Sequence, residues 1–307
     1  MVTRKDLDLL RVLADFRLAT SPLLAARLAV SEQMIRRRCR NLADEGLLKV
    51  VPRNPGQGRG RPEWVYSLKS AGVGELTRAK VLREGVPIDH VTGDNVEREC
   101  EHQLLVNWMI VWSKAIEQQD AALSVKFISS KSPYHLALSG GSILFDQVEF
   151  PSGECLSFTP DAAICLTHKG TNKSLLFFIE VDLGTETIAD PKRINDTDLR
   201  HKILVYRAYL GRGGYKRSQD RALFQGQFRG FRLLLVSSTV QRCTALCQLV
   251  RQLPPSDFVW VTDYNAVENH GMEHPVWFAG GQTQDKHSIL GRKSSQQVAA
   301  ANLSGSN

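Results

Sequence analysis

The sequence predicts an α/β protein in two parts, a helical N-terminal domain closed by a β-hairpin and a larger domain built on a mixed sheet. Three observations predict this class. Amphipathic helices joined by tight turns fill residues 3–45, and two apolar runs around the polar break at 168–174 indicate a buried hairpin. A strand–helix–strand pattern over 231–262 indicates parallel pairing. At 307 residues, the chain is long enough for two cores.

Changes in composition suggest where the parts begin and end. A segment with Pro87 and Gly93 interrupts the periodic pattern, and the last residues thin to Gln, Ser, Ala and Asn. We therefore predict an N-terminal helical domain at 1–80, a linker at 81–95, the α/β domain at 96–280 and a disordered tail at 281–307.

Charge, hydropathy and cysteine content indicate which partners and which cellular compartment to expect. The net charge is +7 and the pI about 9.1, a basic excess that suits nucleic acid as a partner. No apolar run approaches the roughly 20 residues of a membrane span, so we expect no membrane partner. The six cysteines have no pairing rhythm and no zinc-ligand spacing. Reduced thiols in a cytoplasmic protein are the expectation.

Three short helices are predicted in the N-terminal domain, each preceded by a capping residue. Their bounds are 3–16 after the cap Thr3, 23–28 after the cap Ser21 and Pro22, and the residues from the cap Ser31 to Glu45 before Gly46. A helix from 70 to about 83 follows, and a longer one from 96 to 119 opens the second domain, with Glu101 and His102 as minor candidates for its site.

Two strands, Leu47–Val51 and Trp64–Leu68, enclose a basic, Gly-rich loop. Three helices followed by such a hairpin resemble a winged helix-turn-helix domain, which implies binding of double-stranded DNA. The arginines that would contact phosphates and base edges are Arg36, Arg37, Arg38 and Arg40 on the third helix and Arg53, Arg59 and Arg61 on the wing. Two alternatives are a merely solvated arginine face and a winged helix that binds protein.

The hairpin around 168–174 brings acids together. If its turn is centred on Gly170–Thr171, the numbers of any two residues that face each other across the hairpin add up to 341. Asp161 then faces Glu180. The two-residue period of a strand puts Asp182 on the same face as Glu180. Like charges in contact need a partner, and two partners are open here: a divalent cation such as Mg²⁺, which binds carboxylate oxygens, or the charge of a lysine.

A helix follows, capped by Asp196, Thr197 or Asp198 and running to about Leu210. Lys202 falls within its apolar stripe, one turn before Tyr206, and is expected to point inward toward the acids. The acids Asp161, Glu180 and Asp182 and the base Lys202 are thus expected to lie close together. The alternative is that these acids lie in solvated turns and that Lys202 extends to water.

Pro160-Asp161 and Glu180 resemble the two acidic half-motifs of the PD-(D/E)xK nuclease superfamily. Position 182 departs from the pattern, since it carries Asp where that superfamily usually has Lys. Some members carry the lysine on the next helix, where Lys202 stands here. The resemblance implies that Asp161 and Glu180 bind Mg²⁺ or Mn²⁺, with Asp182 as a further ligand. It also implies that Lys202 stabilises charge near the scissile phosphate, so that these four residues are the predicted catalytic residues.

Taken over residues 5–265, the chain resembles the replication-relaxation family of plasmids and other mobile elements. The resemblance rests on the N-terminal helices and on four segments: 159–162, 177–186 (Phe-Phe-Ile-Glu-Val-Asp-Leu-Gly-Thr-Glu), 201–206 and 233–236. It implies a role in plasmid replication and DNA relaxation, and no particular reaction.

Two functions remain open. The first is a Mg²⁺-dependent DNA endonuclease or nickase positioned by its winged helix. The second is a non-catalytic replication or transcription regulator whose nuclease-like domain serves dimerisation, as a homodimer, or ligand sensing. In the second case we expect carboxylates in salt bridges, for instance Asp182 with Lys202 or Arg193.

Overall fold

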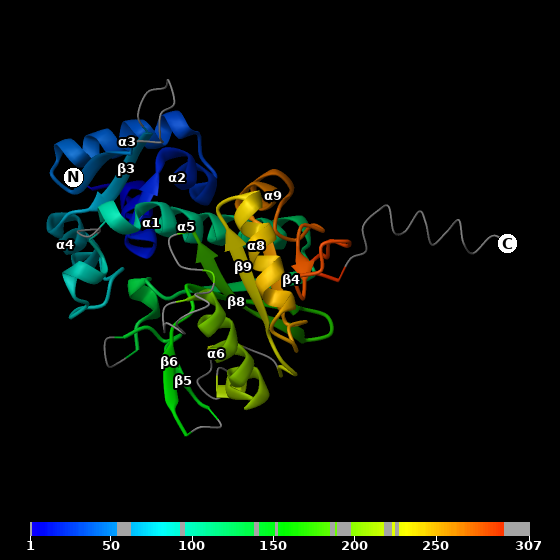
Figure 1. The fold of residues 1–307 in the computed structure, drawn as a ribbon. Coiled ribbons are helices and arrows are strands. Elements are labelled where there is room, and N and C mark those ends of the chain that lie inside the picture. Colours follow the sequence, from blue (N-terminus) through cyan, green and yellow to red (C-terminus); the bar gives the residue numbers. More distant parts are fainter. Residues whose placement is uncertain are drawn as a thin grey trace. The chain divides into compact units, whose positions relative to one another are not determined.

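The computed structural model describes residues 2–53, 63–92, 96–137, 141–150, 153–184, 188, 198–217, 223–224 and 227–291. Helices and sheets alternate in an α/β fold, as predicted (Figure 1). The chain forms two compact units. The first holds the residues up to 111 together with 129–143, and the second holds 112–128 and the residues from 144 onward.

The first unit combines helices with a three-stranded antiparallel sheet of order β1-β3-β2. Its elements are α1 (Arg4–Phe16), β1 (Leu18–Thr20), α2 (Ser21–Leu28), α3 (Glu32–Asp44), β2 (Leu48–Arg53), β3 (Glu63–Leu68), α4 (Ser70–Arg78), the 3-10 helices η1 (Ile88–His90) and η2 (Pro133–His135), and the first part of α5 (Val96–Gln119).

Local side-chain bonds explain where these helices begin. The Thr3 hydroxyl accepts from Asp6 N while the Asp6 carboxylate accepts from Thr3 N, which makes a capping box for α1. Ser31 caps α3 by accepting from Met34 N. The predicted cap Ser21 is wrong, because Ser21 is the first residue of α2 and its hydroxyl donates to Tyr66.

The segment predicted as a linker is packed into the first unit where it is described. Val91 and Thr92 are buried, and Arg17 donates to the carbonyl of Asp89. The start of α5 joins the same core, because the Asn107 amide donates to the carbonyls of Phe16 and Leu18 at 3.0 and 2.9 Å. Residues 93–95 lie outside the described part.

The second unit is built on a six-stranded sheet of order β11-β10-β9-β8-β7-β4 with a separate hairpin, β5-β6. Its elements, after the rest of α5, are β4 (Leu123–Ser129, its last residue in the first unit), β5 (Asp146–Glu149), β6 (Cys155–Phe158), β7 (Ala162–His168), β8 (Lys173–Asp182), α6 (Leu199–Gly211), the 3-10 helix η3 (Gly214–Lys216), β9 (Arg232–Ser237), α8 (Val240–Arg251), β10 (Val259–Asp263), α9 (Tyr264–His270) and β11 (Phe278–Ala279).

The sheet confirms the predicted hairpin register. Ala162 pairs with Ile179 and His168 with Lys173, and both pairs sum to 341. Strands β8, β9 and β10 are parallel. Because parallel crossovers are right-handed, α6 and α8 cover the same face of the sheet, and Figure 1 shows both in front of β8 and β9.

Two boundaries differ from the prediction. The strand predicted at 142–150 is shorter, and as β5 it pairs with β6 outside the main sheet. The disordered tail predicted from 281 is wrong for residues 281–291, because His287 pairs with Trp277 and Ile289 is buried. The remainder of that tail lies outside the described residues. In the described part of the chain, no helix has the length and apolar content to cross a membrane.

Candidate functional site

The predicted acids lie at one end of the β7–β8 hairpin. Glu180 and Asp182 belong to β8 and are 4% and 3% exposed. Asp161 precedes β7, and one of its carboxylate oxygens accepts from Val181 N at 2.9 Å. The structure therefore brings Asp161 and Glu180 to neighbouring positions, as the register predicts.

Glu180 has a donor on each carboxylate oxygen. The Tyr206 hydroxyl donates to Oε1 at 2.6 Å, and the Lys202 ammonium donates to Oε2 at 3.1 Å. Burial raises the pKa of Glu180 to about 7; the nearby charge of Asp161 raises it too, while Lys202 and Tyr206 oppose the shift. Lys202 thus points toward the acids, as the helical period predicts.

Helix α6 positions both donors. Asp198 caps it by accepting from His201 N at 2.6 Å, so of the three predicted caps only Asp198 lies in the described part and acts as the cap. Lys202 and Tyr206 are one turn apart on the face of α6 that covers the sheet. The Tyr206 ring packs edge-on against Phe158 at 5.0 Å and also contacts Phe178. Burial and the charge of Glu180 raise the pKa of Tyr206 well above its ordinary value.

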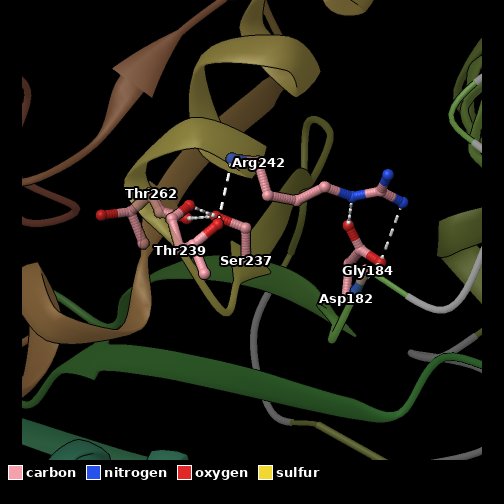
Figure 2. A network of polar contacts seen from close by, with 6 residues as sticks. All are labelled: Asp182, Gly184, Ser237, Thr239, Arg242 and Thr262. Atoms are coloured by element: carbon pink, nitrogen blue, oxygen red, sulfur yellow. Dashed lines mark hydrogen bonds and ion pairs between the residues drawn. The ribbon is translucent and has the colours of Figure 1, made fainter.

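Asp182 pairs with an arginine that the sequence analysis did not single out. Figure 2 shows the Arg242 side chain reaching from α8 to Asp182, with Nε–Oδ2 and Nη2–Oδ1 distances of 2.5 and 3.2 Å. Gly184 N also donates to Asp182, at 2.9 Å. Lys202, one of the two partners expected for Asp182, is paired with Glu180 instead, and the other, Arg193, lies outside the described residues.

The strand ends beside Asp182 hold the start of α8 in place (Figure 2). Ser237 is the β9 partner of Asp182, and its hydroxyl donates to the carbonyls of Thr239 and Thr262, both at 3.1 Å. Thr239 caps α8 by accepting from Arg242 N at 3.1 Å. The one sequence signal for Arg242 is its place in the first turn after this Thr cap.

The side chains that donate to Glu180 and Asp182 occupy the oxygens that the predicted Mg²⁺ or Mn²⁺ site would use. A hard cation needs carboxylate oxygens that converge on one point. Asp182 is instead bound in bidentate fashion by Arg242, and both oxygens of Glu180 accept from side chains. Across the described ranges, no group of three or more His, Cys, Asp or Glu side chains could hold a metal ion. The three carboxylates as arranged here do not fit a divalent cation.

Helix α3 presents the other predicted site. Ile35, Cys39 and Leu42 face the core of the first unit. Arg36, Arg37 and Arg40 are exposed on the remaining surface of the helix. Within the described residues, Arg36 is the one of the three in an ion pair, with Glu32 one turn earlier.

Two other predicted arginines are occupied within the first unit. Arg38 is turned toward α1 and forms an ion pair with Asp6 at 2.6 Å. Arg53 at the end of β2 binds Glu63 at 2.6 Å and Glu101 at 2.5 Å, and these partners raise the pKa of its guanidinium, Glu101 most. Glu101, a minor candidate for the other site, is therefore a partner of Arg53. Arg59 and Arg61 lie outside the described residues.

A cleft of about 710 Å³ separates α3 from the β2–β3 hairpin. Arg36 and Arg40 line its helix side, and Val50 and Trp64 line its strand side. Trp64 is 39% exposed, which is unusual for so large an apolar side chain. The exposed arginines thus border a concave surface in the first unit.

Comparison with known protein families shows to which family the chain belongs. The replication-relaxation family matches residues 10–223. The chain belongs to the replication-relaxation family. This membership suggests a role in the replication and relaxation of mobile elements. The matched range includes α3, the β7–β8 hairpin and Lys202, and it ends before Arg242. No curated protein and no solved structure matches the chain.

Proposed function

We propose that this member of the replication-relaxation family binds double-stranded DNA of a plasmid or other mobile element through α3, as a winged-helix protein. The observation that carries the proposal is the exposure of Arg36, Arg37 and Arg40 on one helix whose opposite face is buried. Such a helix fits the major groove, where arginines bind phosphates and guanine edges.

The topology of the first unit supports the winged-helix assignment. α2 and α3 are joined by a short turn, and the β2–β3 hairpin follows α3 directly. β1 adds a third strand beside β3. This order of elements places a two-stranded wing next to the helix that would read DNA, with the cleft between them.

We further propose that the second unit acts without metal-dependent catalysis. Its support is the pairing of the carboxylates, since Asp182 is neutralised by Arg242 and Glu180 by Lys202. A buried carboxylate whose charge is balanced by a cationic partner needs no metal to balance it. The second unit would then serve assembly or ligand sensing, as the alternative function predicts.

A nuclease remains the second candidate because of one observation. Lys202 lies 3.1 Å from Glu180, which is next to Asp161, and the pKa of Glu180 is raised to about 7. Perturbed carboxyl groups beside a lysine are common at catalytic sites.

A salt titration of DNA binding tests the first proposal. We expect the triple variant Arg36→Gln/Arg37→Gln/Arg40→Gln to lose about 100-fold or more in association constant at about 0.1 M salt, with the log–log salt slope falling by about 3. The control carries the same charge change on exposed cations of the first unit, Lys69→Gln/Lys80→Gln/Arg83→Gln. Equal binding by the two triple variants would contradict the proposal.

A plasmid assay separates the two candidates for the second unit. Supercoiled DNA is incubated with the wild type and with Glu180→Gln, each with Mg²⁺ or Mn²⁺. We expect no nicking above that of buffer from either protein. Nicking by the wild type that Glu180→Gln removes would favour the nuclease.

A further inference from the structure

A second basic surface lies in the second unit, at the amino ends of β8 and β9, which are the tails of their arrows in Figure 1. A cleft of about 1030 Å³ opens there. We call it the basic cleft and define it by Lys173, Leu175, Gln227, Arg229, Arg232 and Asp257. It is separate from Glu180 and Asp182, because Lys173 and Asp182 are the two ends of β8, nine residue steps or about 30 Å apart.

The cations of the basic cleft have no carboxylate partner within the described residues. Lys173 and Arg229 are exposed, and no ion pair involves either of them in that part of the chain. Arg232 is half-buried, and its guanidinium lies 4.5 Å from the ring centroid of Trp260. Burial lowers the pKa of Arg232, and no ion pair of Arg232 is formed within the described ranges. Among the described residues that line the cleft, Asp257 is the single carboxylate.

Uncompensated cations in a cleft favour an anionic ligand. A half-buried guanidinium loses part of its hydration, and an anion restores the lost interaction more effectively than water does. The contact with the Trp260 ring also restricts where the Arg232 guanidinium lies, so it is held in place before a ligand arrives. Gln227 adds a polar side chain that can donate to oxygen.

The spacing of the cations favours an extended ligand. Arg232 on β9 lies beside Phe177 on β8, and Phe177 is four residues beyond Lys173. The Cα atoms of Lys173 and Arg232 are therefore about 13 Å apart in the direction of the strands. Lys173, Phe177 and Arg232 also project from the same face of the sheet, given the two-residue period. Cations spread over that length exceed the size of one phosphate group and match several phosphates of a nucleic-acid strand.

We propose that the basic cleft binds the phosphate groups of a DNA strand, as a second DNA contact of the chain in its second unit. This inference rests on the proposed function, because it assigns another contact to the same DNA. Lys173 and Arg229 contribute salt-dependent attraction, and Arg232 supplies a preoriented bidentate donor.

The test uses the full chain with a labelled duplex of about 30 base pairs, over a range of salt concentrations. The variant is Lys173→Gln/Arg229→Gln, since both side chains are exposed and Arg232 stays in place. The control is Arg212→Gln/Arg251→Gln, which removes two exposed arginines of the second unit outside the cleft. We expect the cleft variant to lose about 10- to 100-fold in association constant and about 2 in salt slope, and the control to change by about twofold or less.

The outcomes separate this inference from the proposal for α3. Equal binding by the cleft variant and its control overturns the inference, whatever the α3 triple variant does. A loss in the cleft variant with none in the α3 variant supports the cleft and overturns the α3 proposal. A last experiment measures by calorimetry how tightly the wild type and the cleft variant bind adenosine triphosphate and inorganic pyrophosphate. If the cleft variant loses affinity for these small ligands while it binds duplex like its control, the cleft serves a small phosphate compound and the DNA inference fails.

Discussion

The exposed arginines of α3 and the carboxylates at the end of β8 differ in what already binds them. Arg37 and Arg40 are exposed, and the ion pair that Arg36 forms among the described residues is with Glu32 on its own helix. Glu180 and Asp182 are buried and are bound by side chains of α6 and α8. Both sets are clusters of like charge in the sequence.

This difference shows which of the two clusters has charged groups available to bind a ligand. An exposed cation loses little when it exchanges water for a phosphate. A buried carboxylate in an ion pair must first give up its partner, at a cost of several kcal/mol. The α3 surface is therefore suited to binding, whereas the carboxylates are suited to holding the helices on the sheet.

Replacing Arg242 should have the largest effect on stability. The variant Arg242→Met leaves the buried Asp182 carboxylate without its cation, and we expect a loss of about 3–5 kcal/mol in the free energy of unfolding. Urea denaturation measures this. The double variant Asp182→Asn/Arg242→Met should recover at least half of the loss, since it removes the unpaired charge. A loss below about 1 kcal/mol in Arg242→Met would mean that the pair does not hold α8 on the sheet.

The pH dependence of stability should report on Glu180. Its pKa in the folded chain is about 7, against an ordinary value of 4.5. The folded state therefore binds this proton more tightly than the unfolded state, and stability falls as pH rises from 4.5 through 7. The full shift corresponds to about 3 kcal/mol.

We expect Glu180→Gln to remove that contribution. Urea melts at pH 5 and pH 8 measure it as the difference between the two proteins, in which the other titrating groups cancel. If the wild type and Glu180→Gln lose the same stability over this range, Glu180 does not have a raised pKa in the folded chain.

Tyr206→Phe should produce a smaller change. The hydroxyl donates to Glu180, and a hydrogen bond to a charged acceptor contributes about 1.5–3 kcal/mol. Because the charged acceptor exists above the pKa of Glu180, the loss should be larger at pH 8 than at pH 5. The control is Tyr209→Phe, which removes a hydroxyl bonded to Asp146 in the same aromatic cluster. The same pH trend in both variants would argue against a specific bond to Glu180.

Arg38→Gln should have the smallest effect. Its partner Asp6 is on α1 and both side chains are partly exposed, so we expect a loss of about 1 kcal/mol or less. DNA affinity should stay within about twofold of the wild type, since the side chain is turned from the exposed surface of α3. A tenfold loss of DNA affinity in Arg38→Gln would mean that Arg38 is part of the proposed DNA interface.

Short-range features of the sequence were enough to predict much of this protein. The caps Thr3 and Ser31 mark where α1 and α3 begin, since a cap acts within three residues. The tight turn after His168 sets the register of β7 and β8, and with it the approach of Asp161 to Glu180. The helical period directs Lys202 inward from α6.

Contacts between residues far apart in the sequence were decided only by the tertiary structure. Asp182 and Arg242 are 60 residues apart, Arg53 and Glu101 are 48 apart, and no local pattern links either pair. The same holds for Arg38, whose position on a basic helix is identical in kind to that of Arg40. Periodicity and capping are properties of neighbouring residues, and they determine which side chains share a face. Which charge that face meets depends on how the elements pack. The sequence by itself identified the acids and directed Lys202 toward them, whereas only the fold revealed Arg242 as the partner of Asp182.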